Sequence, residues 1–124
     1  MNNKLKTIIL EDDMVSRMIL ENYCKNHPFI DLIKDFDDIA SAKEFLAKET
    51  ADLVLLDIQL KNSSGFDLLQ HLPPSTQVIV TTGSKKSIEE ANKLGLDNCL
   101  LKPISLESFL FSIKKLESAS SELI

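Results

Sequence analysis

Three short apolar runs that end in charged residues constrain the fold of this chain more than any other feature of its sequence. They are residues 7–10, followed by Glu11, Asp12 and Asp13; residues 53–56, followed by Asp57; and residues 98–101, followed by Lys102. Runs of this length are typical of strands that are buried on both faces of a parallel sheet. The charged residues are then expected at the carboxyl ends of the strands, where open α/β sheets bind their ligands.

The whole chain alternates between strand patterns and helix patterns. Strands are predicted at residues 5–10, 29–36, 52–57, 77–81 and 98–101. Helices are predicted at residues 14–26, 39–46, 66–72 and 88–94, and from residue 106 onward. Five strand–helix units with short connections predict an α/β fold, in which a five-stranded parallel sheet carries helices on both faces.

Local signals support these elements. The spacing of Val15, Met18 and Ile19 is helical, and Ser87 is a candidate N-cap for the fourth helix. The alternation of apolar residues in 29–36 is imperfect, which predicts an edge strand.

Composition and charge exclude several classes of protein. With 124 residues, the chain is long enough for one domain with a substantial core. A net charge of −5, with no cationic block longer than Lys85-Lys86, argues against direct binding of nucleic acid. The spacing of Cys24 and Cys99 does not fit a metal site, so we expect reduced thiols and a cytoplasmic protein. No run approaches the roughly 18 apolar residues that a membrane span needs, and no signal peptide is expected.

The acidic residues at the predicted sheet edge point to a metal site. Glu11, Asp12 and Asp57 would repel one another there unless a cation with a preference for oxygen ligands offset their charge. Mg²⁺ fits best, because it binds one or two carboxylates and keeps several waters. Lys102 would add a positive charge and Thr81 a hydroxyl donor. An aspartate in such surroundings can act as a nucleophile toward phosphorus and form an aspartyl phosphate.

The order Glu11-Asp12, Asp57, Thr81, Lys102-Pro103 resembles the receiver domain of two-component response regulators. The resemblance covers about residues 6–116 and implies a flavodoxin-like (βα)5 topology. Residues 56–60 and 64–69 further resemble receivers that precede a DNA-binding domain of the LytTR type. On this basis residues 1–118 are expected to form the receiver domain, and residues 119–124 a tail or the start of a linker.

The resemblance implies a role for each residue of the predicted site. Asp57 is implied as the phosphoacceptor, and Mg²⁺ (or Mn²⁺) as the ion bound by Asp12, by Asp57 and by the backbone carbonyl of Gln59. Glu11 is implied to act on the ion through water.

Two further residues are implied to hold the phosphoryl group, namely Thr81 and Lys102, and the peptide bond between Lys102 and Pro103 is expected to be cis. The implied partner is a histidine kinase or phosphotransfer protein. Such a domain catalyses only its own phosphorylation and dephosphorylation. Its output is transcriptional if the chain belongs to a longer regulator. A homodimer through the fourth helix, the fifth strand and the last helix is also expected, without contact to nucleic acid or membrane.

Three residues depart from that family. Lys61 stands where such receivers usually carry a proline, so we expect a looser loop and unaltered chemistry. Gly83 leaves the mouth of the site without a side chain. Cys99 occupies the place of an aromatic residue whose movement usually links the site to the surface, so that link should rest on backbone shifts instead.

The same residues argue against two other functions. A carrier of FMN needs a first loop rich in Ser, Thr and Gly, whereas this loop is acidic. A phosphatase with an aspartate nucleophile usually has a second aspartate two residues later, where this chain has Gln59. The alternative that stays open is a receiver-like interaction module that works without phosphorylation.

Overall fold

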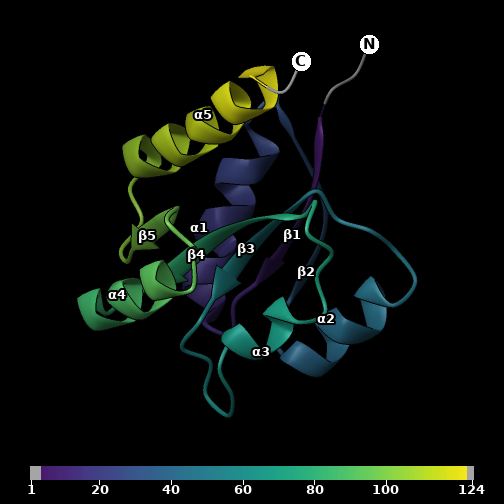
Figure 1. The fold of residues 1–124 in the computed structure, drawn as a ribbon, viewed down its shortest axis with the longest axis vertical. Coiled ribbons are helices and arrows are strands. Elements are labelled where there is room, and N and C mark those ends of the chain that lie inside the picture. Colours follow the sequence, from purple (N-terminus) through teal and green to yellow (C-terminus); the bar gives the residue numbers. More distant parts are fainter. Residues whose placement is uncertain (1–3, 123–124) are drawn as a thin grey trace.

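Five parallel strands form a central sheet with the order β2-β1-β3-β4-β5, and helices cover both of its faces (Figure 1). The computed structural model describes residues 4–122. The strands are β1 (Leu5–Leu10), β2 (Ile30–Phe36), β3 (Leu53–Asp57), β4 (Gln77–Thr82) and β5 (Cys99–Leu101). The helices are α1 (Met14–Lys25), α2 (Ile39–Leu46), α3 (Phe66–Leu69), α4 (Lys85–Lys93) and α5 (Leu106–Glu122). The predicted α/β fold and the edge position of β2 are confirmed.

The apolar runs supply side chains to both faces of the sheet, because successive residues of a strand point in opposite directions. Ile8, Val54 and Leu56 belong to a core cluster with residues of α2, α3 and α4. Ile9 and Leu55 belong to a second cluster with residues of α1 and α5. Helices therefore cover both faces of the sheet, which leaves the ends of the strands accessible for a site.

Helix α4 begins earlier than the sequence predicted. Its N-cap is Ser84, whose Oγ accepts a hydrogen bond of 3.3 Å from the backbone N–H of Ser87. Ser87, which we expected to be the cap, lies inside the first turn. Both serines suit an N-cap, and the backbone path out of β4 decides between them. Asp38 caps α2 and Gly95 takes a positive φ of 83° after α4, as their residue types suggest.

Helix α1 exposes much of its apolar surface. Leu20 and Cys24 are buried, one turn apart, whereas another face of the helix is open to solvent. The exposed group consists of Met14, Val15, Met18 and Ile19, with exposed fractions of 38% to 65%. We call these four side chains the α1 apolar group. It begins two residues after Asp12, at the sheet edge where the charged residues lie.

The ends of two elements differ from their predicted limits. Helix α3 has only four residues, where residues 66–72 were predicted. Helix α5 continues to Glu122, past the point where the apolar pattern ends, and residues 123 and 124 lie outside the described part. The domain limit at residue 118 stays a prediction. None of the helices described is both long and apolar enough to cross a lipid bilayer.

Candidate functional site

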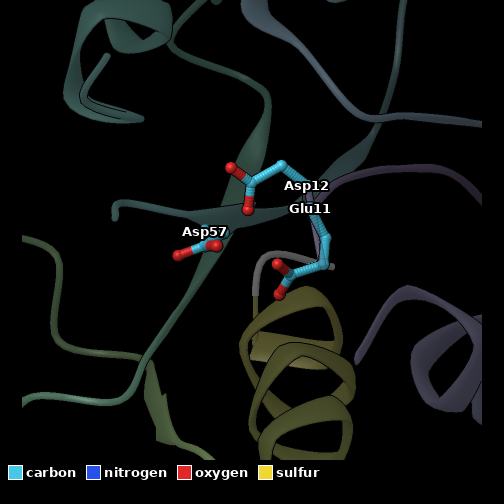
Figure 2. Close-up of side chains that lie close together, drawn as sticks. All are labelled: Glu11, Asp12 and Asp57. Atoms are coloured by element: carbon cyan, nitrogen blue, oxygen red, sulfur yellow. The ribbon is translucent and has the colours of Figure 1, made fainter. Parts of the chain in front are cut away.

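Three carboxylates meet at the carboxyl edge of the sheet (Figure 2). Glu11 and Asp12 follow β1, and Asp57 is the last residue of β3. One oxygen of each lies within 4.8 Å of the others. Glu11 and Asp57 are buried, and Asp12 is partly exposed. The structure thus brings together the acidic residues that the strand pattern predicted.

Lys102 lies between two of these carboxylates. Its Nζ is 2.6 Å from Glu11 Oε1 and donates a hydrogen bond of 3.1 Å to Asp57 Oδ2. At this distance the ammonium of Lys102 and the carboxylate of Glu11 form a close ion pair. Three carboxylates and one ammonium leave an excess of two negative charges at this edge.

Burial and charge shift the pKa values of the ion pair. Burial is the largest cause, and together with the neighbouring Asp57 it raises the pKa of Glu11 to about 7. Burial alone would lower the pKa of Lys102, but the contact with Glu11 and the charge of Asp57 outweigh it, so this pKa is raised. Lys102 therefore stays charged, while Glu11 holds its proton more tightly than an exposed glutamate.

The donor set suits a divalent cation with oxygen ligands. All three acidic residues offer carboxylate oxygens, and the two excess negative charges match the charge of such an ion. Glu11 Oε1 is buried beside the Lys102 ammonium, and a carboxylate oxygen has a second lone pair for a water or an ion. The residues present thus fit Mg²⁺.

Thr81 supplies the hydroxyl that the sequence predicted. It pairs with Asp57 across β3 and β4, and it is 1% exposed. Its Oγ1 is buried and has no hydrogen-bond partner, which is rare for a buried polar atom. The Lys102–Pro103 bond is cis, as expected.

The backbone of Lys61 makes a hydrogen bond at the site. Its backbone N–H donates a hydrogen bond of 2.7 Å to Asp12 Oδ2. A proline at this position has no N–H and cannot make this bond. This bond ties the loop after β3 to one of the acidic residues, which argues against a looser loop, and the expectation of unaltered chemistry stays a prediction.

Gly65 is a site residue that the motifs in the sequence did not identify. A Cβ atom on Gly65 would lie 2.2 Å from the carbonyl oxygen of Asp57 and 2.9 Å from the Cα of Ile58. Its N–H also donates to the carbonyl of Ile58, at 3.3 Å. Only glycine allows the loop to return this close to Asp57. A glycine in a turn-rich stretch after the acidic residue was the available signal, but it does not reveal the close approach.

Gln59 lies at the mouth of the site. Its backbone N–H donates a hydrogen bond of 2.9 Å to Asp57 Oδ1. Its side-chain Oε1 accepts from Thr82 Oγ1 at 2.8 Å and from the N–H of Gly83 at 3.3 Å. The predicted role of its backbone carbonyl as a metal ligand stays a prediction, and the contacts of its side chain were not foreseen.

Comparison with known proteins gives a consistent result. The family model of the response regulator receiver domain matches residues 7–114. The sensory transduction protein LytT of Enterococcus faecalis is 29% identical over 122 residues, which are 96% of this chain and 49% of that protein. The sensory transduction protein LytR of Staphylococcus haemolyticus is 30% identical over 116 residues, which are 91% of this chain and 45% of that protein. This chain spans about half the length of the curated relatives it matches.

Solved structures show the same likeness. The response regulatory domain of protein mrkE from Klebsiella pneumoniae superimposes with a TM-score of 0.83 at 25% identity. The match covers 94% of this chain and 98% of that domain.

Proposed function

Because this chain belongs to the family of response regulator receiver domains of two-component systems, we propose that Asp57 accepts a phosphoryl group from a phosphohistidine of a partner protein. The observation that carries the proposal is the position of Asp57 between the Lys102 ammonium and the unpartnered Thr81 hydroxyl. Such a carboxylate can act as a nucleophile toward phosphorus. The ammonium and the hydroxyl donor can then stabilise the additional negative charge of the aspartyl phosphate.

The transfer needs little covalent chemistry from the protein. An oxygen of Asp57 attacks phosphorus, the bond between phosphorus and the imidazole nitrogen breaks, and its electron pair stays on the nitrogen. Lys102 offsets the charge on the phosphoryl oxygens, and Thr81 can donate a hydrogen bond to one of them. The chain acts on its own aspartate and on no separate substrate.

The residues proposed to hold Mg²⁺, or Mn²⁺ in its place, are Asp12, Asp57 and the backbone carbonyl of Gln59, with Glu11 acting through water. The ion would offset the excess negative charge of the site and that of an incoming phosphate. Lys61 and Gly65 keep the loop and the carboxylates of Asp12 and Asp57 in place.

A histidine kinase or phosphotransfer protein is the proposed partner. A phosphohistidine is a side chain of another protein, so that protein must cover the mouth of the site to reach Asp57. The α1 apolar group adjoins this mouth, and exposed apolar side chains of this kind mark surfaces that bind proteins. The α1 apolar group is therefore a suitable docking surface for the phosphodonor.

The output of the domain is also a proposal. The relatives are about twice as long as this chain and include the transcriptional regulatory protein CitB of Klebsiella pneumoniae, which supports a transcriptional output. The surface of α4, β5 and α5 exposes Leu101, Leu110 and Phe111, which suits the expected homodimer. A cytoplasmic location and the absence of nucleic-acid contacts by this domain stay predictions.

Intact-mass measurement tests the proposal. After treatment with acetyl phosphate and Mg²⁺, the chain should gain one phosphoryl group, whereas Asp57→Asn and a sample in chelator should not. If Asp57→Asn gained the group as readily as the natural chain, the assignment would fail. If neither chain were ever modified, the interaction module that works without phosphorylation would be favoured.

A further inference from the structure

Gln59 is in contact with both Asp57 and the loop that leads from β4 to α4. Its backbone N–H donates to Asp57 Oδ1 at 2.9 Å, and its Oε1 accepts from Thr82 Oγ1 at 2.8 Å and from the N–H of Gly83 at 3.3 Å. Its backbone is held by a bridge to Ser64 within the loop after β3. Within residues 4–122, no other side chain of that loop hydrogen-bonds the β4–α4 loop.

The contact continues to the start of α4. Thr82 is fully buried, and its hydroxyl donates to Gln59 and accepts a hydrogen bond of 3.2 Å from the backbone N–H of Ser84. Ser84 is the N-cap of α4, and its Oγ accepts from the N–H of Ser87. A hydroxyl that donates and accepts at once strengthens both bonds. Hydrogen bonds, joined through the covalent structure of Gln59 and Ser84, therefore connect the Asp57 carboxylate with the first turn of α4.

Other side chains near the β4–α4 loop offer weaker connections. Gly83 has no side chain, and a Cβ placed there would meet nothing within 4 Å. Thr81 Oγ1 has no partner in this structure. Cys99, on β5, is small and partly buried, and its Sγ donates to the carbonyl of Leu96 at 3.4 Å and, over a long 3.9 Å, to Oδ1 of Asn92 in α4. The bond between Gln59 and Thr82 is therefore the shortest of these side-chain contacts.

From these contacts we propose that Gln59 is a positioning residue that holds the β4–α4 loop in its resting place and passes the phosphorylation of Asp57 on to α4. The proposal rests on Asp57 being the phosphoacceptor. When Asp57 becomes an acyl phosphate, the oxygen that carries the phosphoryl group is the bridging oxygen of a mixed anhydride, and the other oxygen is a neutral carbonyl. The backbone N–H of Gln59 then loses a charged acceptor, so the hydrogen bond between Gln59 and Asp57 becomes weaker. Movement of Gln59 displaces Oε1, the atom that accepts the hydrogen bond of the Thr82 hydroxyl, and through Ser84 it changes the cap of α4.

Amide hydrogen exchange across residues 82–93 of the full chain tests this inference. The measurement is made with and without beryllofluoride and Mg²⁺, which imitate the phosphoryl group. The informative variant is Gln59→Met, which keeps the length of the side chain and removes its acceptor. Thr82→Val removes the partner hydroxyl at nearly constant volume, and Gln59→Glu restores an acceptor. Asn62→Ala is the matched control, because Asn62 lies exposed on the same loop.

Without beryllofluoride, Gln59→Met and Thr82→Val should exchange about tenfold faster than the natural chain at residues 83–87, since one hydrogen bond of the loop is lost. Gln59→Glu and Asn62→Ala should exchange at the natural rate. With beryllofluoride, the change in exchange across α4 should shrink to about half or less in Gln59→Met and stay intact in Asn62→Ala.

The two proposals fail in different ways. If beryllofluoride changed nothing in the natural chain, Asp57 would not be the phosphoacceptor, and the inference would fall with it. If the natural chain responded and Gln59→Met responded equally, Asp57 would keep its role but Gln59 would not pass the signal on. Unaltered resting exchange in Gln59→Met would show that Gln59 does not hold the loop. A thermal melt of each variant confirms that it is folded.

Discussion

The loops after β3 and β4 flank the same aspartate but are held in very different ways. The first, residues 58–65, is fixed by backbone contacts, namely the close approach of Gly65 to Asp57, the bond from Lys61 to Asp12 and the bridge from Gln59 to Ser64. The second, residues 83–84 with Thr82 at the end of β4, is linked to the first by hydrogen bonds to a single side-chain atom, Gln59 Oε1. The difference separates two tasks, because a nucleophile and its metal ligands need fixed positions, whereas a signal needs a segment that can move.

The largest expected effect concerns two glycines, one in each loop. Gly65→Ala should lower the free energy of unfolding by roughly 3 kcal/mol, because its Cβ would collide with the backbone of Asp57 and Ile58. Gly83→Ala is the matched control and should change it by no more than about 0.5 kcal/mol, because its Cβ meets open space. Urea denaturation in the absence of Mg²⁺ measures both. Equal losses in the two variants would remove the distinction between a fixed and a free loop.

Charge also distinguishes the two sides of the site, because the acidic residues adjoin β1 and β3 and none lies in the β4–α4 loop. Burial raises the pKa of Glu11 from 4.5 to about 7. Between these values the folded protein holds a proton that the unfolded chain has lost, so raising the pH through this range lowers stability. The loss should be on the order of 2 kcal/mol.

Unfolding in chelator at pH 5 and pH 8 measures this effect, with Glu11→Gln as the reference. The glutamine does not titrate, so the natural chain should lose stability relative to the variant as the pH rises. A natural chain that gained stability relative to Glu11→Gln would contradict the account of the acidic cluster.

A third prediction concerns the backbone bond that fixes the β3 loop to Asp12. Lys61→Pro removes the N–H donor, so Asp12 should lose its orientation and Mg²⁺ affinity should fall about tenfold. Lys61→Ala keeps the N–H and should bind Mg²⁺ as the natural chain does. Isothermal titration of the two variants with Mg²⁺ makes the comparison. Equal affinities would show that the bond from Lys61 does not serve the site.

The smallest effect separates two adjacent threonines at the end of β4. Thr81→Val should leave stability unchanged or raise it by up to about 1 kcal/mol, because its buried hydroxyl has no partner. Thr82→Val should lower stability by about 1 kcal/mol, because its hydroxyl is bonded to Gln59 and Ser84. Thermal or urea unfolding without phosphodonor tests both signs. A clear loss in Thr81→Val would mean that its hydroxyl already has a partner at rest.

The sequence predicted those parts of the site that depend on strand ends. Glu11, Asp12, Asp57 and Lys102 follow apolar runs, and parallel strands carry such residues to one edge whatever the loops do. The same logic predicted Thr81. The fold followed from the alternation of apolar strands and helical patterns. The N-cap of α4 differs from the prediction, because Ser84 takes this place and not Ser87, a second serine three residues later.

The contacts that sequence reasoning missed depend on the path of the loop backbone. The N–H of Lys61, the Oε1 of Gln59 and the missing Cβ of Gly65 act through positions that no hydrophobic pattern encodes. A lysine in place of a proline at position 61 also adds a backbone N–H donor. The exposure of the α1 apolar group was not evident either, since helical spacing alone does not say which of two apolar faces is buried.

The identity of the phosphoacceptor is the claim on which the comparison of the two loops depends, and one chemical measurement tests it most directly. The chain is treated with acetyl phosphate and Mg²⁺ and then reduced with borohydride, which converts an aspartyl phosphate into homoserine, and the peptides are mapped by mass spectrometry. We predict conversion at Asp57 and at no other acidic residue, including the neighbouring Asp12. Conversion at Asp12 or elsewhere with Asp57 unchanged would contradict the account.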